Sequence, residues 1–318
     1  MTPPASDHFN GKTFFNPGPR ADRGLLDVLR WQFTSRAARW PRWVDIAPPP
    51  LPPAPQGSAV AVTWVNHATF LLQTPWGNLL TDPVFSDRVS PVSWAGPRRV
   101  HAPGVALDAL PRIDVVLVSH DHYDHCDLPS LRRLAQRHPA LFVAPLRHHA
   151  LLAAAGAHRI VELDWWQAHQ LGPETAVTLT PSRHWSRRHI GGTNHRLWGG
   201  FHLRLGPHRV WFVGDSGYDQ ELFREIGRRG GAPDLALVPI GAYEPRWFMS
   251  AAHMNPAEAV RTHQDSGARR SVAMHWGAFQ LTDEGRDEPV RALEQARASA
   301  GLGAKKFLVL QPGESVTV

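Results

Sequence analysis

The sequence predicts an α/β protein with a large buried core. Short apolar runs, each followed by a polar or glycine-containing loop, alternate along the chain with longer segments that read as helices. Hydrophobic residues make up 42% of the 318 residues, which is enough for a large core. We detect no internal repeat, and the length alone suggests about two domains.

The predicted elements follow in chain order from these patterns. The short apolar runs predict strands over residues 59–65, 69–74, 113–118, 141–144, 177–180, 210–213, 235–239 and 271–274. The longer segments predict helices over residues 128–137, 147–155, 256–264 and 289–300.

Residues 1–58 differ from the rest and are interpreted as an N-terminal extension. Its proline-rich stretch, residues 47–55, cannot be helical and predicts an extended polyproline connector. Before it, residues 25–44 mix tryptophans and leucines with arginines. This segment could lie in a lipid headgroup layer, or it could be a helix packed on the domain with ordinary core tryptophans. The sequence leaves both interpretations open.

Targeting signals and cysteine usage indicate the compartment. No apolar stretch approaches the roughly 20 residues that cross a bilayer, and the amino terminus lacks a secretory apolar region. The single cysteine, Cys126, permits no internal disulfide and is expected to be a small buried residue. We expect a cytoplasmic protein, with peripheral attachment to the inner membrane face as an alternative.

The chain is basic, with a formal charge of +6 that comes almost entirely from arginine. Arginine favours bidentate phosphate contacts, but an arginine-rich composition also follows from a GC-rich genome. The net charge alone does not indicate whether the protein binds an anionic lipid. We expect no nucleic-acid partner.

The hexapeptide at residues 120–125 carries the strongest chemical signal. It reads His-Asp-His-Tyr-Asp-His and follows the apolar run 113–118. In an extended segment, His120 and His122 leave the same side of the backbone and can hold one ion. Asp124 and His125 come one turn later, where a second ion could lie. The sequence therefore predicts a metal site.

Three further candidate ligands lie in the same setting, each just after a short apolar run. His184 follows residues 177–180, Asp215 follows 210–213, and His275 follows 271–274. Oxygen and imidazole donors without thiolates suit a borderline divalent ion, zinc foremost, with iron or manganese as alternatives.

Longer motifs surround these residues. They are TW at 63–64, NHAT at 66–69, TDP at 81–83, ELDWW at 162–166, FVGDSGY at 212–218, IGAYEPRWFM at 240–249, AMHWG at 273–277 and GES at 313–315. With these motifs the chain resembles the metallo-β-lactamase superfamily, and within it the branch of phospholipases D that hydrolyse N-acylphosphatidylethanolamine. The likeness covers roughly residues 60–318.

The resemblance implies a fold and a ligand set. Residues 59–318 would form one catalytic domain, an αββα sandwich with the metals at one edge between two sheets. Asp82 would orient a metal-bound imidazole, although a turn-forming aspartate before proline is the alternative. His120, His122 and His184 would hold one zinc, Asp124, His125 and His275 the other, and Asp215 would bridge them.

The resemblance also implies an activity. Paired metals activate water for attack at phosphorus, so Asp124 and Asp215 would belong to the machinery of a phospholipase D-type phosphodiesterase. His253 matches a family histidine near the substrate phosphate and is the candidate for aiding the leaving group; a solvent-exposed residue at a helix start is the alternative. A phospholipid partner and a homodimer are implied as well.

One departure from the family pattern bears on the substrate. Ala252 and Asn255 stand where the mammalian pattern has a glutamine and an aspartate, which puts recognition of the N-acyl head group in doubt. The alternatives are a hydrolase of a soluble phosphodiester or sugar-phosphate lactone, and a non-enzymatic protein that kept its metals.

Overall fold

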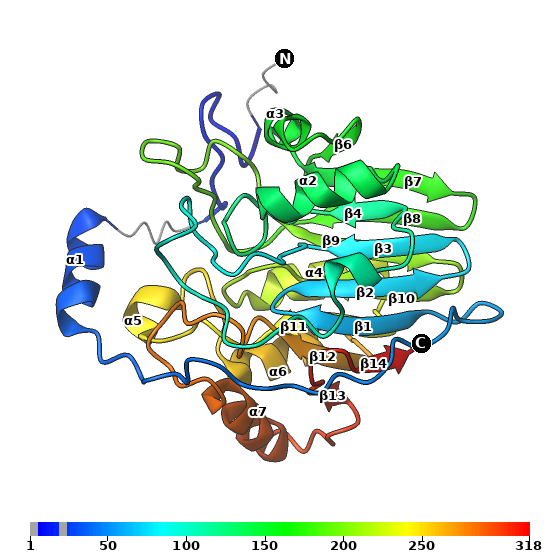
Figure 1. The fold of residues 1–318 in the computed structure, drawn as a ribbon. Coiled ribbons are helices and arrows are strands. Elements are labelled where there is room, and N and C mark those ends of the chain that lie inside the picture. The colour runs from blue at the N-terminus through cyan, green and yellow to red at the C-terminus, as the bar shows by residue number, and fades with distance from the viewer. Residues whose placement is uncertain (1–5, 19–23) are drawn as a thin grey trace.

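The computed structural model describes residues 6–18 and 24–318, and two sheets form its centre. The sheets lie face to face, with helices on their outer surfaces (Figure 1). The predicted αββα architecture is therefore confirmed.

Each sheet has seven strands among the described residues. The first runs in the order β14 (Ser315–Thr317), β1 (Ala61–Asn66), β2 (Thr69–Thr74), β3 (Gly77–Thr81), β4 (Val115–Leu117), β5 (Leu141–Pro145) and β6 (Arg159–Leu163). The second runs β13 (Phe307–Leu308), β12 (Arg270–Met274), β11 (Leu235–Pro239), β10 (His208–Phe212), β9 (Gly200–Leu205), β8 (Thr175–Thr180) and β7 (Ala168–Gly172).

Alternating side chains of the first sheet divide between two apolar cores. In β2, Phe70 and Leu72 belong to the core shared with the second sheet, whereas Leu71 belongs to the core beneath the helices. In β4, Leu117 faces the first of these cores and Val116 the second. The period of two explains why these strands are apolar on both faces: each face is buried.

Helices cover both outer faces. The first sheet is covered by α2 (Leu128–Arg137) and α3 (His149–Ala154), which bury Leu131 and Leu152 against it. α4 (Gln220–Gly230), α6 (Pro256–Asp265) and α7 (Glu288–Ser299) share a core with the second sheet. α6 begins at Asn255, whose side chain accepts the Glu258 backbone N–H at 2.9 Å while Glu258 bonds back.

Parallel pairing brings many loops to one edge. β3, β4, β5 and β6 pair in parallel, and so do β10, β11 and β12. β8 runs in the same direction as β10, because both pair antiparallel with β9. The segments that follow these strands therefore all leave from the carboxyl edge of the sandwich, which we call the loop edge.

The predicted elements all exist, but the prediction was incomplete. β2, β11 and α2 have the predicted bounds, and the other predicted elements shift by a few residues at their ends. The sequence did not predict β3, β6, β7, β9, β13, β14, α4 or α5 (Arg246–Met249). A short 3₁₀ turn covers Leu107–Ala109.

The N-terminal extension packs against the rest of the chain. Phe9 and Phe14, from an arm formed by residues 6–17, are buried in the same core as the sheets. α1 (Leu25–Thr34) is anchored through Trp31, whose indole N–H donates to Asp283 at 3.1 Å. Residues 47–55 form neither helix nor strand. Within residues 6–18 and 24–318, no helix combines the length and the apolar composition needed to cross a bilayer.

Gly104 provides a test of how the C-terminal loop closes on the sandwich. A Cβ added there would lie 2.0 Å from the backbone nitrogen of Gly313, which itself donates to Trp64 in β1. Gly104→Ala is therefore expected to lower the free energy of unfolding by about 1–3 kcal/mol, measured by urea denaturation. Gly303→Ala is the control, because nothing lies within 4 Å of its added Cβ. Equal stability of the two variants would contradict the packing.

Candidate metal centre

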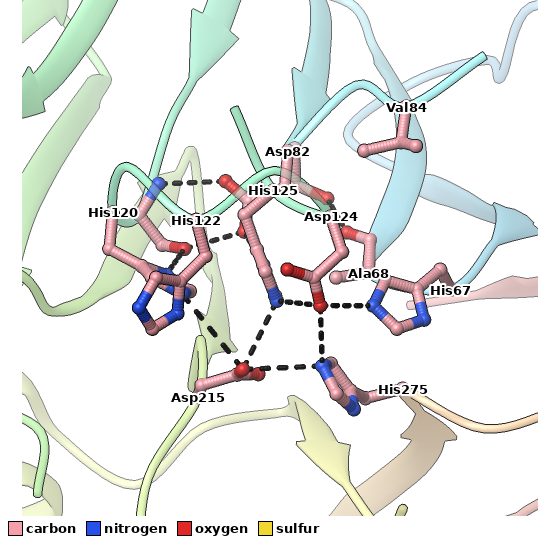
Figure 2. Close-up of polar contacts among 12 residues, drawn as sticks. His67, Ala68, Asp82, Val84, His120, His122, Asp124, His125, Asp215 and His275 are labelled. Atoms are coloured by element: carbon pink, nitrogen blue, oxygen red, sulfur yellow. Dashed lines mark hydrogen bonds and ion pairs between the residues drawn. The ribbon is translucent and has the colours of Figure 1, made fainter. Parts of the chain in front are cut away.

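The seven predicted ligands converge at the loop edge. His120, His122, Asp124 and His125 lie on the loop after β4, and the other three follow β8, β10 and β12. Figure 2 shows the carboxylate of Asp215 close to the imidazoles of His125 and His275. Two neighbouring groups of candidate ligands result.

The first group contains His120, His122 and His184. Nδ1 of His122 lies 2.9 Å from Nε2 of His120 and 3.3 Å from Nε2 of His184. Ligands of a tetrahedral zinc, each about 2.1 Å from the metal, are roughly 3.4 Å apart. The three nitrogens thus have the spacing of one coordination shell.

Hydrogen bonds on the opposite nitrogens fix which atoms face inward. Nδ1 of His184 donates to the backbone carbonyl of Ala252 at 3.0 Å, and Nδ1 of His120 lies 2.9 Å from Oγ of Ser119. In both rings the proton belongs on Nδ1, so Nε2 keeps its lone pair. Burial holds the pKa of His120 and of His184 well below its usual range, so both rings remain neutral.

The second group joins two carboxylates to two imidazoles. Nε2 of His125 lies 3.4 Å from Oδ2 of Asp124 and 3.1 Å from Oδ2 of Asp215. Nε2 of His275 lies 3.4 Å and 3.2 Å from the same two oxygens. Asp215 also comes within 3.8 Å of Nε2 of His184, so it stands between the two groups.

The second group strongly favours positive charge. Burial alone would raise the pKa of Asp215, but His125 and His275 hold it well below its usual range. Burial alone would lower the pKa of His275, but Asp215 and Asp124 raise it to about 9. Two ionised, buried carboxylates thus draw cationic charge into a site with little access to water.

The residues present fit a dinuclear metal centre. Nitrogen and oxygen donors converge from four separate loops, and Oδ1 of Asp215 is buried with no hydrogen-bond partner among the described residues. A buried polar atom of this kind calls for a partner, and a metal ion is one. The buried clusters are therefore consistent with two ions, one in each group.

Asp82 supports this arrangement from behind. Its carboxylate accepts from Nδ1 of His125 at 2.7 Å, from the backbone N–H of Ser119 at 2.7 Å and from the Ser119 hydroxyl at 2.6 Å. Asp82 is fully buried. The geometry matches the orienting role that the resemblance implied, because the contact leaves Nε2 of His125 free to face the site.

His253 lies beside the first group. Its side chain is 12% exposed, so it is not the solvated residue of the alternative interpretation. Nδ1 lies 4.0 Å from Oδ2 of Asp215, and the ring centroid lies 5.0 Å from that of His184. Burial lowers the pKa of His253 to about 4, so its ring is neutral near pH 7.

The prediction missed His67 as a site residue. Nε2 of His67 lies 3.0 Å from Oδ2 of Asp124, and the ring lies 4.0 Å, centroid to centroid, from that of His275. Its place in the NHAT motif directly after a strand was the signal that could have identified it. His67 belongs to the same buried cluster as Asp124, His125 and His275.

The backbone is unusual at three of these positions. His67, Asp82 and His275 have φ values of 44°, 32° and 61°. Left-handed conformations are uncommon in residues other than glycine and cluster at functional sites, where the surrounding structure enforces them. The left-handed backbone at these strand ends therefore directs the three side chains toward the candidate metal centre.

Two residues outside the motifs hold the ligand loops. The guanidinium of Arg188 donates to the carbonyls of Asp121 and Cys126 at 2.9 and 2.8 Å, bracketing the loop after β4. The amide of Asn16, in the N-terminal arm, donates to the carbonyl of His184 at 2.8 Å. Cys126 itself is fully buried in the apolar core, as expected, and burial raises its pKa to about 12.

Replacing Asp82 should weaken metal binding without unfolding the protein. Asp82→Asn puts an amide where His125 and Ser119 need an acceptor, so the affinity for zinc is expected to fall about 10- to 100-fold. Competition with a chromophoric chelator measures this affinity. Asp87→Asn is the control, because the Asp87 side chain is 74% exposed. Unchanged affinity in Asp82→Asn would show that the carboxylate does not orient the imidazole.

Replacing Arg188, which contacts the backbone of the ligand loop, should also weaken zinc binding. Arg188→Met removes both hydrogen bonds to the ligand loop, and the zinc affinity is expected to fall roughly tenfold. Arg187→Met, at the exposed neighbouring position, should leave affinity unchanged. If the two variants bind zinc equally, the Arg188 contacts do not support the metal loop.

Comparison with known proteins agrees with the geometry. Residues 77–276 match the beta-lactamase superfamily domain. An uncharacterized protein of Mycobacterium tuberculosis is 41% identical over 300 residues, covering 91% of this chain and 79% of that protein. The N-acyl-phosphatidylethanolamine-hydrolyzing phospholipase D 1 of Caenorhabditis elegans is 37% identical over 268 residues, covering 81% of this chain and 75% of that protein.

A solved structure supports the fold. Igni18, a metallo hydrolase from the archaeon Ignicoccus hospitalis, superposes with a TM-score of 0.61 at 23% identity, covering 82% of this chain and 98% of Igni18. The fold, the matched domain and the buried histidine and aspartate clusters lead to one conclusion. The chain belongs to the metallo-β-lactamase superfamily, as a metal-dependent hydrolase in the branch similar to the N-acylphosphatidylethanolamine-hydrolysing phospholipases D.

Proposed function

We propose that the protein is a dizinc phosphodiesterase of phospholipase D type. It would cleave N-acylphosphatidylethanolamine or a related phospholipid to phosphatidic acid and an N-acylethanolamine. The observation that carries the proposal is the pair of buried ligand groups with Asp215 between them, in a chain 37% identical to a phospholipase D of this specificity.

The donor set supports zinc. Imidazole and carboxylate ligands without a thiolate suit zinc, and they also admit iron or manganese. His120, His122 and His184 would hold one ion and Asp124, His125 and His275 the other, with Asp215 between them. When bound, such a pair supplies Lewis acidity to a phosphodiester and makes a nearby water a better nucleophile.

Residues of the protein itself would attract the substrate and contact its leaving group. The carboxylates of Asp124 and Asp215 keep cationic charge at the point where a phosphodiester anion must enter. His253 is neutral near pH 7 and can donate one ring N–H. Its Nδ1 is buried without a hydrogen-bond partner among the described residues, so the ring could donate a hydrogen bond to the leaving oxygen, whose proton would come from the attacking water.

A soluble substrate is the second candidate, because of position 252. Ala252 offers only its backbone carbonyl, which holds His184, and no amide side chain for an N-acyl head group. The same site could then act on a soluble phosphodiester or a sugar-phosphate lactone. A phospholipid partner, a peripheral position on a membrane and a homodimer belong to the first candidate.

A product analysis with an Asp215 variant tests the proposal. Zinc-loaded protein is incubated with N-palmitoylphosphatidylethanolamine in mixed micelles, and the products are identified by mass spectrometry. We expect phosphatidic acid and N-palmitoylethanolamine from the natural protein, and none from Asp215→Asn, which loses the shared carboxylate charge. Asp108→Asn is the control, since the Asp108 side chain is 68% exposed on the surface.

Two outcomes would contradict it. A fully active Asp215→Asn variant would remove the two-metal assignment. A protein that binds two metals but releases neither product would shift the assignment to the soluble substrate, to be examined with a panel of soluble diesters and lactones.

A further inference from the structure

The loop edge exposes large apolar side chains on three separate segments. Leu26 and Phe33 on α1 are 81% and 86% exposed, Trp94 after β3 is 79% exposed, and Ile190 between β8 and β9 is fully exposed. Figure 1 places α1 beyond the strand ends, on the side of the molecule away from the C-terminus. The metal ligands leave their strands at this same edge.

α1 has one anchored face and one free face. On the inner face, Trp31 stacks on Phe248 of α5 with ring centroids 5.0 Å apart. Arg30, four residues after Leu26 and so on the outer side, reaches over the ring of Trp247 at 4.5 Å. Leu26 and Phe33 are seven residues apart and therefore lie on one stripe of the helix. This stripe is exposed, so packing within the chain does not account for it.

Ile190 stands at the tip of a narrow loop, residues 187–193, which we call the finger. Its base is closed by Asn194, whose backbone N–H donates to the Ser186 carbonyl at 2.7 Å and whose side chain accepts from the Ser186 N–H at 3.1 Å. Arg188 then ties the finger to the metal loop. A hydrogen-bonded base with an exposed isoleucine at the tip suits insertion into an apolar layer.

The charge around these apolar groups is positive. Arg36, Arg39 and Arg42 follow α1 and are exposed, and Arg187 is exposed on the finger. None of the four forms an ion pair among the described residues, and the acidic residue within 25–44 is Asp27. Exposed apolar residues beside unpaired arginines match the headgroup layer of an anionic bilayer.

We propose that the outer face of α1 and the tip of the finger insert into the surface of an anionic phospholipid bilayer. The proposal rests on the proposed function, since it would bring the metal centre to phosphodiester headgroups. A second copy of the chain fits this surface less well, because a twofold interface would place the same unpaired arginines near one another. The exposed apolar residues also lie on three separate segments, whereas a dimer interface favours one continuous patch.

Vesicle sedimentation tests the proposal apart from catalysis. The probe is the zinc-loaded full chain carrying Asp215→Asn, with vesicles of phosphatidylcholine alone or with about 30% phosphatidylglycerol. We expect binding to the anionic vesicles that weakens in high salt. Phe33→Ser with Ile190→Ser, and separately Arg36→Glu with Arg39→Glu, should each reduce the partition coefficient about tenfold or more.

Matched controls lie at the opposite edge of the sandwich. Arg112 precedes β4 and Arg159 is the first residue of β6, so Arg112→Glu with Arg159→Glu makes the same charge change far from the loop edge and should leave binding nearly unchanged. Absence of binding to anionic vesicles would overturn the proposal, and so would equal losses in the test and control pairs. A dimer in light scattering that Phe33→Ser dissociates would assign this face to a second copy instead.

The two proposals fail in different ways. Hydrolysis of micellar substrate by a protein that does not bind vesicles would refute the docking surface and leave the proposed function standing. Vesicle binding by a protein that hydrolyses no phospholipid would refute the proposed function and leave the docking surface standing.

Discussion

The buried carboxylate of Asp82 joins the parts on which the metal centre depends. Through three hydrogen bonds it links the end of β3 to Ser119, in the loop after β4, and to the ring of His125. Ser119 in turn contacts His120. One side chain with no exposure therefore fixes the start of the ligand loop, the tautomer of one ligand and the contact to another. Such an arrangement leaves little freedom in how the loop can fold.

The site could be predicted from the sequence where ligands are dense or follow apolar strands. The hexapeptide and the residues after β8, β10 and β12 satisfied that condition. Arg188 and Asn16 did not, because they act through backbone carbonyls, and no residue pattern reveals which carbonyl a side chain will reach. His67 had the NHAT motif as a signal but no spacing relation to the other ligands, so its contact with Asp124 emerges only in the folded β1–β2 turn.

Three of the elements that escaped prediction lack a clear apolar pattern. β6 and β7 are edge strands of their sheets, where exposed and charged side chains replace the apolar run that identifies a buried strand. α4 is mostly polar, and its buried side chains, Phe223 and Ile226, are too sparse to signal a helix. In residues 25–44, Trp31 packs inward whereas Leu26 and Phe33 are exposed, and composition alone cannot assign such faces.

The pairing of β1 with β14 has a consequence for how the protein is made. Ala61 lies opposite Thr317, so the first sheet cannot be completed until the last residues of β14 have left the ribosome. The N-terminal arm also makes a late contact, because Asn16 donates to the carbonyl of His184, 168 positions later in the chain. Long-range closures of this kind slow folding and expose strand edges in the meantime. The first sheet should therefore keep β1 as an unpaired edge until β14 has been synthesised.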